Sequence, residues 1–178
     1  RSHLFTSTLV DLSMDNFKKS MLKINYQKVS NDNYLKLFDL QSPLLLDDNS
    51  VLESKIQFDL EHENYDLTTS FEMYATLNGS NSDRYQYVLP NYDFSKNFSL
   101  DNIDGSFNFN SYGNNTLTDT NVVGSTISND LIYSALDKFF DNGIKTNFEV
   151  SLKNINTVGK NNPTYKNSPQ SELMSTYR

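Results

Sequence analysis

The stretch Val51–Leu77 reads VLESKIQFDLEHENYDLTTSFEMYATL, and it decides the fold class of this chain. On both sides of the segment HENYD, apolar side chains recur at every second position. Because successive side chains of a β-strand point to opposite faces, this alternation predicts two antiparallel strands with one apolar and one polar face. The apolar face must contact either a protein core or lipid, and the rest of the sequence bears on that choice.

The same alternation recurs along most of the chain, so we expect an all-β fold. The expected architecture is an antiparallel up-and-down meander of about nine long strands in one curved sheet, forming part of a large transmembrane β-barrel. A tilted membrane strand needs about 9–11 residues, whereas strands of soluble proteins most often hold about 5–6. The expected strands span roughly residues 3–12, 18–29, 51–62, 66–77, 84–98, 104–112, 120–134, 143–154 and 171–178.

Two segments depart from simple alternation. In RYQYVLPNYDFSKNF the apolar positions shift by one residue at Pro90, which has no N–H for a ladder hydrogen bond. A β-bulge at Leu89–Asn91 would keep the apolar positions on one face, and the alternative is two short strands that meet at a bend. The segment SNDLIYSALDKFFDNG also has helical spacing, so we expect a strand to about Ser134 and allow one helical turn within 135–142.

The composition excludes several classes of function. The 178 residues carry a formal net charge of −7, and phosphate backbones select basic surfaces, so nucleic acid is not an expected partner. The absence of cysteine excludes a disulfide framework and a thiolate metal site. No run approaches the roughly 20 apolar residues of a membrane helix. Barrel strands remain possible because their hydrophobic signal alternates.

No motif for catalysis or cofactor binding is present: there is no nucleophile elbow, P-loop, dinucleotide glycine pattern or HExxH. His3 and His62 are far apart and are more typical of polar strand or turn residues than of ligands. The carboxylates could form a glycosidase-type pair, but most alternate along strand faces, as on a solvated sheet. LDNIDG and LLDDNS lack the ligand spacing of a calcium loop. We therefore expect no catalytic residue, cofactor or metal, and no enzyme activity.

The expected connections sort by length between the two edges of the meander. SMDNF, EHENYD, SLDNID and LDKFFDNG are fairly short, whereas the opposite edge includes SNDNYLKLFDLQSPLLLDDNS and INTVGKNNPTYKNSPQ. Long loops at one edge and tight turns at the other are typical of outer-membrane barrels. A soluble sandwich with Greek-key crossings has no reason to sort its loops in this way.

Several segments resemble a known family. INYQKVSNDNYLKLFDL carries Val29, Ser30, Asp32 and Tyr34, and resembles a recurrent stretch of the LptD (organic solvent tolerance) family of LPS-assembly outer-membrane proteins. There a strand that ends in a V-S-x-D-x-Y-F-like motif runs into an exposed loop; Leu35 stands here where an aromatic residue is usual. SDRYQYVLPNYDFS resembles the family's following strand. SFNFNSYG, SNDLIYS and NGIKTNFEVSLKNINT resemble the form of this barrel in low-GC Gram-negative lineages, so the resemblance covers essentially the whole chain.

The resemblance implies that residues 1–178 are an internal fragment of a β-barrel domain, with no complete domain boundary inside. It implies a structural and transport role in the outer membrane of a Gram-negative bacterium, in the assembly of lipopolysaccharide into the outer leaflet. The implied partners are lipopolysaccharide, membrane lipid, an LptE-like lipoprotein plug and the periplasmic Lpt bridge. In this family the lipid exits through a lateral seam between the first and last strands of the barrel. The resemblance places neither of these strands in the fragment, so no residue of the exit gate is carried over. Better-studied members of the family have cysteines that bridge the barrel to a preceding periplasmic jelly-roll domain. These cysteines are also absent here, although they usually fall outside this region.

Together, the resemblance and the loop pattern predict two sets of side chains. Those expected to face lipid are Leu52, Ile56, Phe58, Leu60, Phe71, Met73, Phe148, Val150 and Leu152. Those expected to face a water-filled lumen are Glu53, Lys55, Gln57, Asp59, Glu72, Lys145 and Glu149. A register slip of one residue would turn several charges toward lipid at once.

Two other functions remain open from the residues alone. A soluble β-sandwich that binds glycans or surface partners would need a second sheet over the apolar face. A barrel enzyme or a nonspecific porin is a third possibility, and the enzyme would need reactive groups that converge at one loop edge. The Tyr and Phe residues fit a core, a carbohydrate platform or an interfacial girdle equally well.

Overall fold

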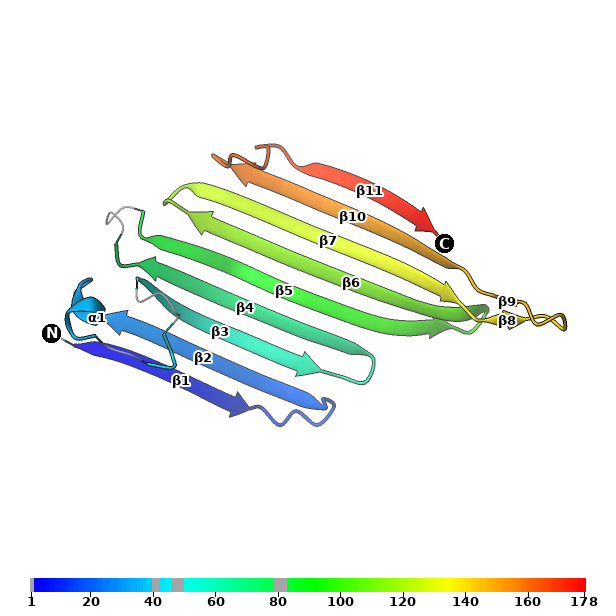
Figure 1. The fold of residues 1–178 in the computed structure, drawn as a ribbon, viewed down its shortest axis with the longest axis horizontal. Helices are drawn as coiled ribbons and strands as arrows, with labels where there is room; N and C mark the ends of the chain where they lie inside the picture. Colours follow the sequence, from blue (N-terminus) through cyan, green and yellow to red (C-terminus); the bar gives the residue numbers. More distant parts are fainter. Residues whose placement is uncertain (1, 40–41, 46–49, 79–82) are drawn as a thin grey trace.

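The computed structural model describes residues 2–39, 42–45, 50–78 and 83–178, and most of these residues lie in β-strands (Figure 1). Within them one sheet of nine strands follows the chain in the order β1-β2-β3-β4-β5-β6-β7-β10-β11. Its strands are β1 (His3–Asp11), β2 (Lys19–Val29), β3 (Val51–Glu61), β4 (Tyr65–Thr76), β5 (Tyr85–Leu100), β6 (Ile103–Thr118), β7 (Val122–Ala135), β10 (Glu149–Lys160) and β11 (Gln170–Tyr177). A short helix, α1 (Tyr34–Leu37), lies between β2 and β3.

The antiparallel meander predicted from the sequence is confirmed. Each strand of the sheet pairs antiparallel with its neighbours, and β1 and β11 lie at opposite edges, so the sheet is not closed into a barrel. The strands are long, with 16 residues in each of β5 and β6 against about 5–6 in a typical soluble protein. The turn between β3 and β4 is tight, and the His62 amide closes it by donating to the Tyr65 carbonyl at 2.8 Å.

The helical turn allowed within 135–142 is not formed. That segment contributes β8 (Lys138–Phe139), which pairs with β9 (Lys145–Thr146) in a two-stranded ribbon that extends past the end of the sheet (Figure 1). Phe139 and Phe140 are largely exposed in this ribbon. A short helix depends on a surface that buries its apolar stripe, and the described residues provide no such surface for the exposed Phe139 and Phe140 rings.

Several expected boundaries were also wrong. β6 continues to Thr118 instead of ending near residue 112, and β10 spans Glu149–Lys160 instead of 143–154. The connection 136–148 carries the ribbon and is long, although it lies at the edge expected to have short turns. The expected sorting of loops therefore holds for the short turns at 62–64 and 101–102 and fails at the connection 136–148.

The strand pairing changes register around Pro90, where the sequence predicts a bulge. The shift falls between Ser70 and Glu72 on the β4 side of β5, and between Val88 and Asn91 on the β6 side. β5 therefore contains extra residues relative to its neighbours at this point. As a result the apolar positions before and after Pro90 stay on one face of the sheet.

The sheet has a single layer and a very small core. The buried apolar side chains Leu35, Leu52, Ala75 and Leu77 form one cluster, in which the α1 segment packs against the end of the β3–β4 pair. A folded monomer of 20.4 kDa exposes about 8,800 Å². This chain exposes 11896 Å². The excess area indicates that a large part of the sheet has no covering layer.

The close approach of β5 and β6 depends on a glycine. The ring of Tyr92 lies over its cross-strand partner Gly113, so that an added Cβ atom would fall 2.0 Å from the ring. We expect Gly113→Ala to lower the free energy of unfolding by about 1–3 kcal/mol, because the ring must leave its position. Denaturant titration followed by circular dichroism measures this effect. Ser175→Ala, at an exposed position on the same face of β11, is the control, and an equal loss there would contradict the prediction.

Candidate functional site

The strand register gathers the predicted apolar side chains on one face of the sheet, here called the apolar face. Ile56 pairs with Phe71, and Val150 pairs with Tyr133. A single cross-strand row joins the two halves of the sheet through direct pairings, so the side chains of both halves can be assigned to the same face. This row runs through Val10, Leu22, Phe58, Thr69, Tyr92, Gly113, Ile127, Asn156 and Ser171.

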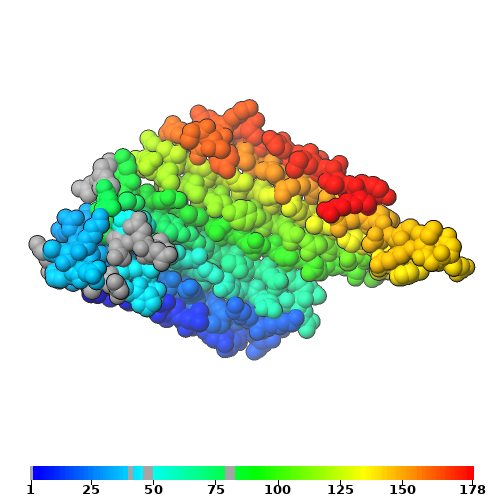
Figure 2. Space-filling model, in the orientation of Figure 1, coloured from blue at the N-terminus to red at the C-terminus, as the bar shows by residue number. Residues whose placement is uncertain are grey.

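Away from the end where α1 packs, the apolar face is uncovered among the described residues. Ile56 and Phe71 are each 44% exposed, and Leu152 is 42% exposed. Figure 2 shows the segment around α1 over one end of the large sheet, and the only other sheet in the described chain is the two-stranded β8–β9 ribbon, which extends past the end of the large sheet. An apolar surface of this extent on a sheet marks a contact with lipid or with a partner.

Charged side chains are confined to the margins of the apolar face. In the described part of the sheet it carries three of them, all lysines. Lys28 and Lys160 lie at or next to the ends of β2 and β10. Lys96 pairs with Tyr65, the first residue after the β3–β4 turn. The long lysine stem can cover apolar surface while the ammonium group stays in water.

A strip of aromatic rings crosses the apolar face from β4 to β11. Neighbouring ring centroids lie 4.9–6.2 Å apart, which is the usual range for interacting rings. Because this face is uncovered, the rings form an exterior surface and not a core. The strip consists of Tyr65, Phe94, Phe98, Phe107, Phe109, Tyr133, Phe148 and Tyr177.

The opposite face is polar and contains a hydrogen-bonded charge network. Glu72 is 8% exposed, and one of its carboxylate oxygens lies 2.9 Å from Lys55 Nζ. Ser70 Oγ donates to that same oxygen at 2.7 Å, and the Tyr74 hydroxyl donates to the other oxygen at 2.7 Å. This arrangement satisfies the buried carboxylate with one cation and two hydroxyl donors. Glu53, Gln57, Asp59 and Glu149 share this polar face.

Two of the predicted side chains are not in the environment expected of them. Leu52 was expected to face lipid, but it is 5% exposed and packs in the cluster with Leu35. Lys145 was expected to face a lumen, but it lies in the β8–β9 ribbon, where its ammonium group is 2.7 Å from Asp137. Both errors arise from connections that fold back on the strands or extend beyond them, which alternation within a strand does not reveal.

The structure brings together the two segments that carry the sequence resemblance. Asp32, just after β2, accepts a hydrogen bond from Arg84 at 2.7 Å, just before β5. Arg84 is 17% exposed, so this ion pair is partly shielded from water. Nearby, the Ser2 amide donates to Ser30 Oγ at 2.8 Å, and the ring of Tyr34 packs against His3. The V-S-x-D-x-Y residues therefore anchor the α1 segment to the sheet.

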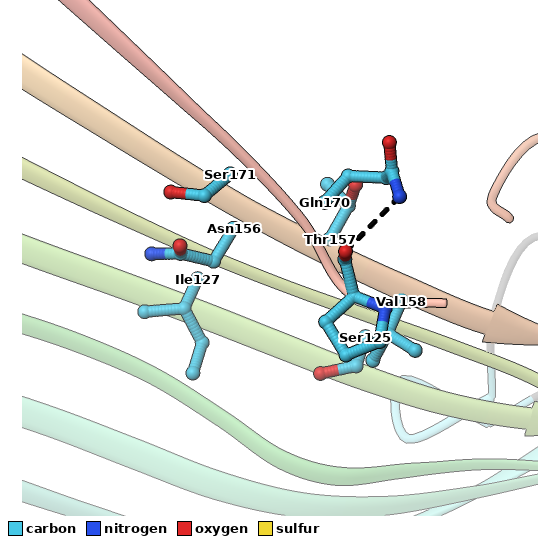
Figure 3. A pocket seen from close by; sticks show the side chains of 8 residues that line it. Ser125, Ile127, Asn156, Thr157, Val158, Gln170 and Ser171 are labelled. Carbon is cyan, nitrogen blue, oxygen red and sulfur yellow. Dashed lines mark hydrogen bonds between the residues drawn. The ribbon is translucent and has the colours of Figure 1, made fainter. Parts of the chain in front are cut away.

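Metal-ligating side chains do not cluster in the described chain. No group of three or more His, Cys, Asp or Glu residues there could hold a metal ion. The hollow in Figure 3 lies between β7, β10 and β11 and is lined mainly by small neutral side chains such as Ser125, Thr157 and Ser171. Its lining contains no acid, base or strong nucleophile positioned for catalysis.

The chain has no detectable relatives in two comparisons. No model of a known protein family matches it, and no curated protein matches it. Within the described residues, no helix is long and apolar enough to cross a membrane.

Proposed function

We propose that this chain is a segment of a transmembrane β-barrel, and that lipid hydrocarbon covers its apolar face. The observation that carries the proposal is the uncovered apolar face of a single-layer sheet, in a chain whose total exposed surface is 11896 Å². The long strands, the marginal lysines and the charge network on the opposite face support it, because a barrel wall is apolar outside and polar inside. The sheet would continue at its two edges into further strands.

We further propose that the barrel resembles LptD and assembles lipopolysaccharide into the outer leaflet of the Gram-negative outer membrane, without catalysis. Lipopolysaccharide, an LptE-like plug and the periplasmic Lpt bridge would be its partners. This step rests on the sequence resemblance. The contact between Asp32 and Arg84 supports it, since the ion pair joins two of the resembling segments.

The barrel proposal is tested by expressing the chain and purifying it with and without detergent. We expect the chain to aggregate without detergent and to become monodisperse, with β circular dichroism, in detergent micelles. A folded, monodisperse monomer in detergent-free buffer would overturn the barrel and favour the soluble β-sandwich.

The lipopolysaccharide role is tested separately in the bacterium that encodes the chain. Depletion of the protein is expected to reduce surface lipopolysaccharide and to increase sensitivity to apolar antibiotics. Surface lipopolysaccharide that stays constant on depletion would overturn this role and leave the barrel proposal standing.

A further inference from the structure

The apolar face contains a group of neutral polar side chains that the proposed function does not explain. This amide patch lies on β6, β7, β10 and β11 and consists of Ser111, Asn129, Asn154, Asn156 and Ser171. Its members bond to one another. Ser111 Oγ donates to Asn129 Oδ1 at 2.8 Å, and Asn154 Nδ2 donates to Ser171 Oγ at 3.0 Å. Figure 3 shows Asn156 and Ser171 beside Ile127 on neighbouring strands.

The amide patch shares cross-strand rows with strongly apolar side chains. Asn156 and Ser171 lie in the row that contains Phe58 on β3. In hydrocarbon, an amide that lacks hydrogen-bond partners costs several kcal/mol. Ser111, Asn129 and Asn154 lie in the row that contains Leu60. A membrane aligned with these rows would place the patch at the depth of Phe58 and Leu60, which favours a hydrocarbon layer that crosses the rows at an angle.

The displacement of the apolar run gives this angle. On β3 the apolar run Ile56–Leu60 is centred on Phe58, and the residue of β10 in the same cross-strand row is Asn156. The apolar run of β10, Phe148–Leu152, is instead centred on Val150, six residues before Asn156. Five pairings separate β3 from β10. With about 3.3 Å per residue and about 4.8 Å between strands, the displacement corresponds to a slope of about 40°. Strands of membrane barrels tilt by about 35–45°.

The ends of the strands show the same offset. Leu60 on β3 and Ser111 on β6 lie in the same cross-strand row. From this row β3 continues for only one residue, to Glu61, whereas β6 extends eight residues in the same direction, to its start at Ile103. The β8–β9 ribbon extends still further in this direction (Figure 1). The ribbon segment exposes the large apolar side chains Leu136, Phe139, Phe140 and Ile144.

We infer that the bilayer crosses this sheet obliquely, and that the outer end of the amide patch, Asn156 and Ser171, docks against lipid headgroups at the membrane surface while the aromatic and aliphatic side chains of the same strands contact hydrocarbon. Ser111 and Asn129 lie deeper, where their hydrogen bond to each other satisfies them. The inference rests on the proposed function. Hydroxyl and amide groups without net charge can donate and accept hydrogen bonds with hydrated headgroups, and they need no partner protein.

The test uses single-cysteine variants. Because the chain has no cysteine of its own, each variant carries a spin label at one position only. Phe58→Cys and Asn156→Cys form a matched pair from one cross-strand row. Each is spin-labelled in phosphatidylcholine vesicles, and collision with oxygen is compared with collision with a water-soluble nickel chelate. We expect oxygen to dominate at Phe58 and the ratio of nickel to oxygen collision to be several-fold higher at Asn156.

Three further variants separate the possible outcomes. Ser171→Cys provides a second patch site, Leu152→Cys a second hydrocarbon site, and Gln57→Cys a polar-face reference. If the labels at the patch sites are as shielded from nickel as the label at Phe58, the oblique placement is overturned and the barrel proposal stands. Nickel access at Phe58 and Leu152 equal to that at Gln57 would instead overturn the barrel proposal itself.

Discussion

Ile56→Lys is expected to lower the free energy of unfolding in lipid vesicles by about 2–4 kcal/mol, the cost of a lysine near the bilayer midplane. The Ile56 side chain is 44% exposed on the apolar face and lies opposite Phe71. The folding equilibrium constant would fall roughly 30- to 1000-fold. Denaturant titration in vesicles, followed by circular dichroism, measures the change.

The adjacent substitution Gln57→Lys is the matched control. It adds the same side chain one position along β3, on the polar face, where water solvates the charge. We expect a change within about 0.5 kcal/mol there. Equal losses at Ile56 and Gln57, or no loss at either, would mean that the apolar face does not contact hydrocarbon.

Lys55→Met is expected to cost about 3–5 kcal/mol, because it leaves the buried carboxylate of Glu72 without its cation. Glu72 is 8% exposed, and its remaining partners are the hydroxyls of Ser70 and Tyr74. The reverse change, Glu72→Met, should cost less, because Lys55 is 23% exposed and its flexible stem can carry the ammonium to water.

A double-mutant cycle separates the pair from its surroundings. The double variant Lys55→Met with Glu72→Met should be more stable than Lys55→Met alone, since no unpaired charge remains buried. Stability is measured in detergent micelles by denaturant titration. Additive losses in the double variant would show that the two side chains do not act as a pair.

Much of the fold follows from local alternation. The period of two in Val51–Leu77 predicted the β3–β4 hairpin and its two faces, and the shift at Pro90 predicted where β5 changes register. Both predictions depend only on the geometry of one strand. The helical turn and the loop lengths were predicted less well, because connections are shaped by what they pack against.

On the apolar face, too, some features follow from local alternation and others are set only by the tertiary structure. Ile56, Phe71 and Leu152 could be assigned to one face from alternation, whereas the burial of Leu52 depends on α1, which is distant in sequence. The aromatic strip and the amide patch could not be recognised from the sequence. Their members come from many strands, and only the register of all the pairings places them side by side.

The sequence alone determined the strand content, the antiparallel order and the two-sided chemistry of this sheet, because side-chain alternation is a property of each strand taken singly. Only the tertiary structure decided that Arg84 meets Asp32, that Glu72 is buried beside Lys55, and that the polar and apolar regions of one face meet along an oblique line. These features arise from cross-strand register and loop packing, which join residues far apart in the chain.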